Sequence, residues 1–163
     1  MFSEDTLTFA RRVLSQARER KVEIVTAESC TGGLVAAALT TIPGSSDAIK
    51  CGFVTYSNHA KTELLGVPEK LIQEHGAVSR ATARAMAKGA CKRIQGRIAV
   101  AVTGLAGPGG DGTDKPVGLV HIAVAYDDIT FDEECRFGDI GRDAVRMRSV
   151  DAALTLLLRM FGP

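Results

Sequence analysis

Thr26-Ala27-Glu28-Ser29-Cys30-Thr31-Gly32-Gly33 is the stretch that decides the fold class of this 163-residue chain. The residues before it, 21–26, include two valines and an isoleucine and predict a short buried strand. The residues from about Thr31 to Thr40 are rich in Ala and Leu and predict a helix. Free N–H groups at a helix start attract anions, and two glycines let a ligand approach closely. The stretch therefore indicates an α/β fold with a ligand site where the first strand ends.

Outward from this stretch, helices and strands alternate first, and a hairpin follows. Helices are expected at residues 4–20, 31–40, 58–65, 68–75, 80–94 and 143–161, and strands at 21–26, 48–56, 97–103, 117–126 and 129–137. This order predicts a three-layer α/β/α sandwich. Because the last two strands form a hairpin, the sheet is expected to be mixed although mostly parallel. No linker or repeat divides residues 1–163, so one domain is expected.

Composition and charge are those of an ordinary soluble protein. Hydrophobic residues make up 45% and charged residues 24%, and the net charge of +1 gives no argument for a nucleic-acid or membrane partner. No apolar run approaches the roughly 20 residues of a membrane span. Cys30, Cys51, Cys91 and Cys135 form no Cys-x-x-Cys pair and are interpreted as free thiols. These features predict a cytoplasmic protein that uses no metal and no cofactor.

A second polar segment, residues 52–61, follows the second strand. Tyr56 is predicted to end that strand, and Lys61 lies one turn into the next helix. Because ligands in open α/β sheets bind at the carboxyl ends of strands, this segment and Ser29 are expected to meet there. A lysine in a dry site loses its proton near neutral pH and can act as a base. Taken singly, Lys61 is more often a surface lysine, and Ser29 or Thr31 is as often a simple helix cap.

A third segment, residues 103–118, is a glycine-rich loop between two strands. A loop of this length is usually functional or mobile, and its backbone could supply donors to a phosphate or an oxyanion. It lacks both the Gly-Lys-Ser/Thr end of a P-loop and the Gly-x-Gly-x-x-Gly spacing of a dinucleotide site. Before the last helix, Arg142 could clamp a phosphate, with Arg146 one turn further on. The alternative there is a helix capped by Asp143 with exposed arginines.

Together these segments resemble the C-terminal domain of the CinA family. The matching runs are residues 26–33, 43–46, 52–61, 76–79 and 103–118. The resemblance implies an α/β/α fold with a mixed sheet. It also implies hydrolysis of nicotinamide mononucleotide (NMN) to nicotinate mononucleotide and ammonia, a step in pyridine nucleotide recycling. For the site, it implies a Ser–Lys dyad at Ser29 and Lys61, with Tyr56, Thr103 and Arg142 in or near it.

The mechanism expected from this resemblance is covalent. Neutral Lys61 takes the proton of Ser29 as the hydroxyl attacks the carboxamide carbon. The substrate and its oxyanion are expected to be held by Cys30, Thr31, Gly32, Gly33, Ser45, Ser46, Thr103, Gly104 and Arg142. Cys30 is also a rival nucleophile, since a helix N-terminus lowers the pKa of a thiol. One departure from the family pattern is that Ile140 and Gly141 interrupt the Gly-Asp-Arg run that precedes the last helix.

Two other classes of function stay open. The chain could be a non-catalytic module that senses a pyridine nucleotide. It could also be an accessory protein in DNA uptake or repair that acts through a partner, although its near-neutral charge argues against direct DNA contact. Full-length CinA proteins carry a further N-terminal pyrophosphatase domain, and this activity is not expected of the present sequence. The expected partners are a small-molecule substrate and further copies of the chain, with no nucleic acid and no membrane.

Overall fold

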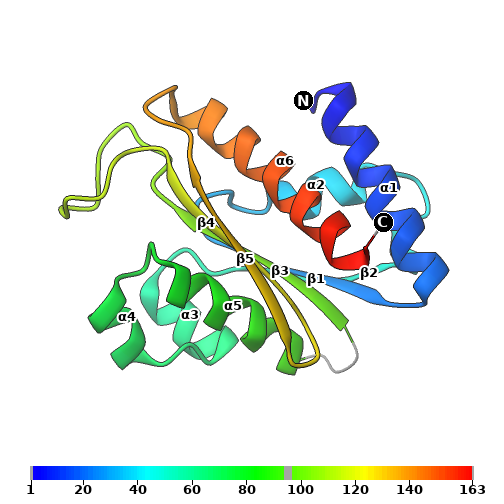
Figure 1. Cartoon of the computed structure of the whole chain (residues 1–163), viewed down its shortest axis with the longest axis horizontal. Helices are drawn as coiled ribbons and strands as arrows, with labels where there is room; N and C mark the ends of the chain where they lie inside the picture. The colour runs from blue at the N-terminus through cyan, green and yellow to red at the C-terminus, as the bar shows by residue number, and fades with distance from the viewer. Residues whose placement is uncertain (1, 94–96, 163) are drawn as a thin grey trace.

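Five strands form one mixed sheet at the centre of the molecule (Figure 1). The computed structural model describes residues 2–93 and 97–162. The strands are β1 (Glu23–Glu28), β2 (Ile49–Val54), β3 (Arg97–Gly104), β4 (Leu119–Tyr126) and β5 (Ile129–Arg136), in the order β2-β1-β3-β4-β5. Strand β1 pairs in parallel with β2 and β3, whereas β3, β4 and β5 pair antiparallel. The predicted mixed sheet is confirmed, with its parallel part at the first three strands.

Helices cover both faces of this sheet, as predicted for a three-layer sandwich (Figure 1). One face carries α1 (Glu4–Arg20), α2 (Leu34–Thr40) and α6 (Arg142–Phe161). The other face carries α3 (Asn58–Leu65), α4 (Glu69–His75) and α5 (Arg80–Arg93). Ser79 caps α5, since its Oγ accepts the N–H of Thr82 at 3.1 Å. That helix was expected to reach Ile94, which lies outside the described residues.

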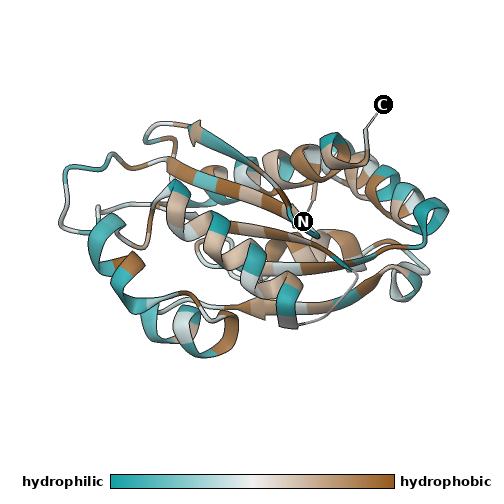
Figure 2. Cartoon of the chain, turned by 60° about the horizontal axis from the view of Figure 1, so that its bottom comes forward, coloured by the Kyte–Doolittle hydropathy of each residue, from teal (hydrophilic) through white to brown (hydrophobic). Residues whose placement is uncertain are grey.

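The two faces of the sheet carry side chains of different size. On β3, Ile98, Val100 and Val102 belong to the core shared with α1 and α6. The alternate residues Ala99 and Ala101 belong to the core shared with α5. Figure 2 shows the hydrophobic strands between helices whose outer surfaces are hydrophilic. The alanine face lets the second helical layer lie close to the sheet.

This close packing extends to the contact between α3 and α5. A Cβ atom built on Gly89 of α5 would lie only 1.9 Å from the carbonyl oxygen of Leu65 at the end of α3. No side chain fits there, so α5 needs glycine at this position to approach α3. Helix α3 carries Lys61, so the place of this lysine in the helical layer depends on the close approach of α3 and α5.

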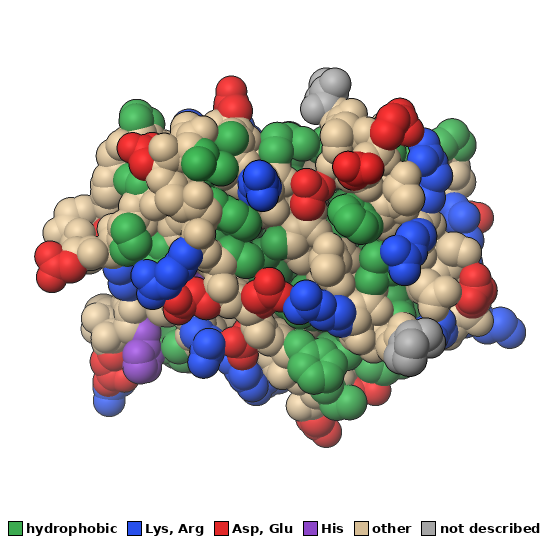
Figure 3. All heavy atoms as spheres, turned by 45° about the horizontal axis from the view of Figure 1, so that its top comes forward, with side chains coloured by type: hydrophobic (Ala, Val, Ile, Leu, Met, Phe, Trp, Pro, Cys, Tyr) green, Lys and Arg blue, Asp and Glu red, His purple; other side chains and the backbone are tan. Residues whose placement is uncertain are grey.

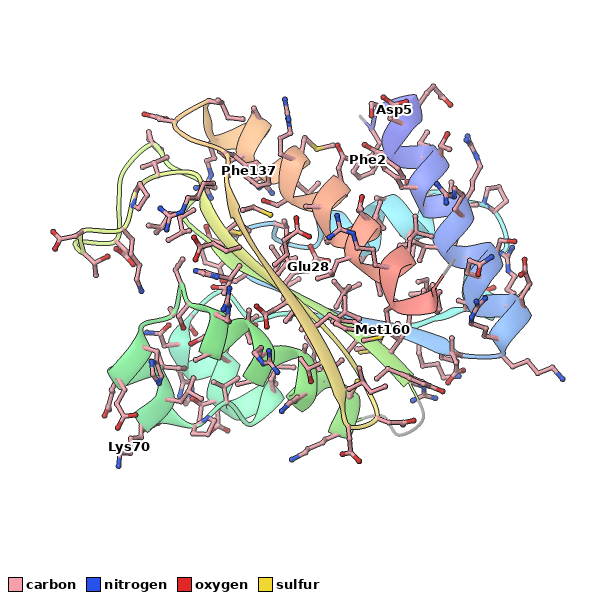
Figure 4. All side chains as sticks on the ribbon, in the orientation of Figure 1. Phe2, Asp5, Glu28, Lys70, Phe137 and Met160 are labelled. Carbon is pink, nitrogen blue, oxygen red and sulfur yellow. The ribbon has the colours of Figure 1, made fainter. Side chains whose placement is uncertain are left out.

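Helix α2 begins at Leu34 rather than near Thr31. The residues between β1 and α2 form a turn in which Gly32 and Gly33 have φ angles of 60° and 97°. The buried carboxylate of Glu28 then accepts the first N–H groups of the helix, from Gly33, Val35 and Ala36, at 3.1, 3.0 and 2.9 Å. Figure 4 shows Glu28 in the interior, between the sheet and the helices above it. An internal carboxylate thus occupies donors that were expected to attract an anionic ligand.

Candidate active site

Three chain segments converge at the carboxyl edge of the parallel strands, as the sequence predicts. Ser29 directly follows β1, Tyr56 lies just beyond β2, and Thr103 and Gly104 end β3. A cavity of about 400 Å³ opens at this edge and is lined by residues from all three segments, together with Lys61 and Arg142. Cavities of a few hundred Å³ are typical of small-ligand sites.

Ser29 and Lys61 form a direct, buried pair in this cavity. The Nζ atom of Lys61 donates to Oγ of Ser29 at 3.1 Å and to the carbonyl oxygen of Thr55 at 3.0 Å. The two residues are 1% (Lys61) and 9% (Ser29) exposed. Lys61 takes part in no ion pair found among residues 2–93 and 97–162. Burial lowers the pKa of the Lys61 amine, which favours its neutral form.

Local sequence explains how Lys61 reaches the serine. Ser57 caps α3 by accepting the N–H of Ala60 at 3.0 Å, so the helix starts directly above the end of β2. Gly66 ends the helix in the left-handed conformation that glycine adopts freely. Lys61 therefore stands in the first turn, close enough to the sheet edge for its side chain to reach back to β1.

The turn that carries Ser29 is held from three sides. The N–H of Ser29 donates to the carbonyl of Val102 on β3 at 2.9 Å, and the N–H of Gly32 closes the turn on the Ser29 carbonyl at 3.0 Å. Arg146 of α6 donates to the carbonyl oxygens of Cys30 and Thr31 at 3.2 and 3.1 Å. The backbone around the serine is thus tied to the sheet and to α6.

Cys30 lines the cavity but lacks the properties of an activated thiol. Burial, together with the nearby charge of Glu28, raises the pKa of Cys30 to about 12. Burial outweighs the lowering of this pKa by the backbone N–H groups of Cys30 and Thr31, and the first N–H groups of α2 bind Glu28 instead. The thiol is protonated at neutral pH, which argues against Cys30 as the nucleophile.

Arg142 joins two of the converging segments at the mouth of the cavity. Its Nη2 donates to the hydroxyl of Tyr56 at 2.8 Å, and its Nη1 donates to the carbonyl of Gly107 at 2.7 Å. The Tyr56 ring is 60% exposed, so it lies at the entrance rather than in the interior. Deeper in the cavity, the Thr103 hydroxyl donates to the carbonyl of Ala77 at 2.8 Å. Arg142 is therefore a cation placed where a bound anion would enter.

Comparison with known proteins identifies the family. The model of the CinA C-terminal domain matches residues 6–161. The chain belongs to the CinA C-terminal domain family. A solved CinA-family structure, the competence/damage inducible protein CihA from Agrobacterium tumefaciens, superposes with a TM-score of 0.95 at 47% identity and covers 98% of both chains. A CinA superfamily protein from Klebsiella pneumoniae superposes with a TM-score of 0.91 at 32% identity.

Relatives of this CinA-family chain differ in length and in name. A CinA-like protein from Synechococcus is 51% identical over 96% of this chain. The chain spans only 29% to 38% of the length of this and similar CinA relatives. A protein from Pseudomonas putida named nicotinamide-nucleotide amidohydrolase PncC is 46% identical over 94% of this chain and 95% of its own length.

Ser45 and Ser46 do not line the cavity of this CinA domain, contrary to expectation. They lie in the short 3-10 helix η1 (Ser45–Asp47), which leads into the amino end of β2. The loop from a helix into a parallel strand lies at the opposite edge of the sheet from the strand's carboxyl end. A six-residue strand separates these edges by roughly 20 Å.

Other residues named from the sequence shape the backbone around the site. Thr31 is fully buried, and Gly32 and Gly33 provide the positive φ angles of the turn. Gly104 does line the cavity, and a Cβ atom there would lie 2.6 Å from a methyl group of Val120 on β4. Glycine at 104 therefore lets β3 and β4 remain paired up to the cavity wall.

Sequence reasoning missed three residues of the site. Glu28 was not assigned a role, although a carboxylate in an apolar strand directly before a helix start is a signal for an internal cap. Asn58 and Asp111 line the cavity, and no pattern in the sequence singled them out. The hydrogen bond from Thr113 lowers the pKa of Asp111, which keeps this carboxylate charged.

Within the described residues, no group of three or more His, Cys, Asp and Glu side chains is arranged to hold a metal ion. In the same part of the chain, no helix has the length and apolar character needed to cross a bilayer. The face shown in Figure 3 carries Lys and Arg side chains interspersed with Asp and Glu.

Proposed function

We propose that this chain is an amidohydrolase that converts NMN and water to nicotinate mononucleotide and ammonia. The observation that carries the proposal is the 3.1 Å contact between the Ser29 hydroxyl and the buried Lys61 amine at a cavity. A serine hydroxyl is a weak nucleophile without a base, and an amine kept neutral by burial is a competent one. The name of the Pseudomonas putida relative supplies the substrate class.

Lys61 is suited to act as the base in the first half-reaction. With the amine neutral, one N–H keeps its bond to the Thr55 carbonyl, and the lone pair can take the proton of Ser29. The Ser29 oxygen forms a bond to the carboxamide carbon, and the carbonyl electrons move onto its oxygen. The N–H groups of Cys30 and Thr31 are the proposed donors to this oxyanion. The cationic pyridinium ring withdraws electrons and favours the attack.

The same lysine completes the cycle. Protonated Lys61 transfers its proton to the amide nitrogen, the C–N bond breaks, and ammonia leaves. Water then attacks the ester on Ser29 while Lys61 accepts one of its protons. The ester C–O bond breaks, Lys61 returns the proton to the Ser29 oxygen, and nicotinate mononucleotide is released. Lys61 accepts and then donates each proton that is transferred, so the scheme uses no cofactor.

Arg142 is the proposed anchor for the substrate phosphate. A guanidinium group binds phosphate in a bidentate manner, and Arg142 stands at the mouth of the cavity with no carboxylate partner found in the described residues. Its present acceptors, the Gly107 carbonyl and the Tyr56 hydroxyl, are neutral groups that a phosphate can replace. Arg142 was expected from the sequence as a phosphate contact, whereas the N–H groups of Gly32 and Gly33 are already bonded to the Ser29 carbonyl and the Glu28 carboxylate.

The test is ammonia release from NMN by the purified chain without added metal. We expect wild type to release ammonia, and Ser29→Ala to lose this activity while keeping its fold by circular dichroism. Ser15→Ala is the matched control, because Ser15 is an exposed serine on α1. Iodoacetamide treatment before the assay tests whether Ser29 or Cys30 is the nucleophile. The protonated thiol of Cys30 should not react, so activity should remain.

Three outcomes would contradict the proposal in different ways. Near-normal turnover by Ser29→Ala would remove Ser29 as the nucleophile. Saturable NMN binding by wild type without ammonia release would favour a sensing module. Neither binding nor turnover, together with stoichiometric capture of a DNA repair protein, would favour an accessory role.

A further inference from the structure

Arg146 is a second arginine of α6 that the scheme above does not use. Its Nε donates to the Cys30 carbonyl at 3.2 Å and its Nη2 to the Thr31 carbonyl at 3.1 Å. The side chain is only 27% exposed, and its one ion pair among the described residues is a 3.9 Å contact to Asp143. This partly buried cation therefore donates to two backbone carbonyls in the turn that carries the proposed nucleophile.

Peptide geometry shows what this arrangement does to the N–H groups of the turn. The Cys30 carbonyl shares a peptide plane with the Thr31 N–H, and the Thr31 carbonyl shares one with the Gly32 N–H. In a planar trans peptide the C=O and N–H bonds point in opposite directions. Arg146 holds both carbonyls on the α6 side of the turn, so both N–H groups point away from α6.

The hydrogen bond made by the Gly32 N–H shows where that direction leads. The Gly32 N–H reaches the Ser29 carbonyl at 3.0 Å, so this N–H points towards the backbone of the serine. The Thr31 N–H, held through its own peptide by the same arginine, faces the same side. It donates to no backbone acceptor in residues 2–93 and 97–162 and lies beside the Cys30 thiol, a weak acceptor that an oxygen formed next to Ser29 could replace.

Charge adds to this orientation. A hydrogen bond from a cation is stronger than one between neutral groups, and it polarises the peptide that accepts it. The N–H at the other end of that peptide becomes a better donor. Donors fixed in advance where negative charge develops contribute most to catalysis of acyl transfer. The charge of Arg146 and the burial of the site both strengthen the hydrogen bond that the Thr31 N–H can donate to an oxyanion.

We propose that Arg146 is a positioning residue for the oxyanion: it orients and polarises the Thr31 N–H for the intermediate formed when Ser29 attacks a carboxamide. It does this through the backbone and touches no substrate. This inference rests on the proposed amidohydrolase function. It assigns to Arg146 a role separate from that of Arg142, which lies one turn earlier on the same helix and faces the cavity mouth.

The first measurement is steady-state ammonia release from NMN by Arg146→Gln and Arg146→Lys. Removal of a direct oxyanion donor costs about 10²- to 10³-fold in rate, so loss of its support is expected to lower kcat by about 10- to 100-fold. KM should stay within about threefold, because the donor acts on the transition state. Arg146→Lys should recover part of kcat. Arg148→Gln is the matched control, since Arg148 is exposed on the same helix.

The second measurement separates oxyanion support from a merely structural role. The thioamide analogue of NMN develops its charge on sulfur, which is a weak hydrogen-bond acceptor. Arg146→Gln should therefore lower ammonia release from the thioamide by at most about threefold, although it impairs the carboxamide reaction much more. Equal losses on both substrates, or a rise in KM with kcat unchanged, would overturn the inference.

Wild-type activity distinguishes this inference from the function on which it rests. Failure of wild type to release ammonia from NMN would overturn the proposed function and the inference together. An active wild type with Arg146→Gln at full kcat would overturn the inference alone. Melting curves of each variant exclude unfolding as the source of a loss.

Discussion

Lys61→Met tests whether burial keeps the catalytic amine neutral. Methionine has a similar length and volume but carries neither a charge nor a proton to exchange. The substitution removes the bonds from Nζ to Ser29 Oγ and to the Thr55 carbonyl. Loss of a general base lowers rates by about 10²- to 10⁴-fold, so ammonia release should fall by that factor.

Stability should respond in the opposite direction to activity. Lys61 is 1% exposed, and burial lowers the pKa of its amine. Each unit by which the folded pKa lies below the unfolded value of about 10.4 corresponds to about 1.4 kcal/mol of destabilisation. Losing hydrogen bonds to Lys61 costs about 0.5–1.5 kcal/mol each. Lys61→Met is therefore expected to be at least as stable as wild type at neutral pH, despite its inactivity.

The stability of wild type should depend on pH through Lys61. Between the folded and unfolded pKa values of Lys61, the unfolded chain binds more protons than the folded one. Wild type therefore gains stability as pH rises through this window, by up to about 1.4 kcal/mol per pH unit, and Lys61→Met lacks this gain. Below the lowered folded pKa the cost of Lys61 is constant. The value of kcat/KM should rise with pH as the lysine loses its proton, and then level off.

The assay is urea unfolding of wild type and Lys61→Met from pH 6 to pH 10, with ammonia release measured at each pH. Lys88→Met is the control, because Lys88 is exposed on α5. The difference in stability between wild type and Lys61→Met should shift in favour of wild type towards pH 10. Parallel stability curves for the two proteins, or half-normal activity in Lys61→Met, would refute the assignment of a buried neutral base.

Two further predictions concern the residues that support the site. Gly89→Ala should destabilise the fold by about 1–3 kcal/mol in urea unfolding, because the new methyl group collides with the Leu65 carbonyl, whereas Lys88→Ala on the same helix should be near neutral. Glu28→Gln should cost about 1–3 kcal/mol, since an amide cannot accept all three N–H groups at the start of α2. An unchanged unfolding midpoint for either variant would contradict the packing or capping described above.

The chain's local patterns by themselves determined the elements and their order. Apolar spacing predicted the helices and strands because the 3.6- and 2-residue periods depend only on neighbours along the chain. The change from strand to helix around Ser29 placed that residue at a carboxyl edge, since such edges follow from strand direction.

Only the tertiary structure decided which distant groups meet and in what electrostatic state. The contact between Ser29 and Lys61 depends on where α3 lies, and α3 packs against α5 at Gly89, far along the chain. Glu28 replaced the anionic ligand expected at the start of α2, and the serines of η1 fell at the far edge. Proximity across layers and loss of solvent arise from packing of the whole chain, so a local pattern does not contain them.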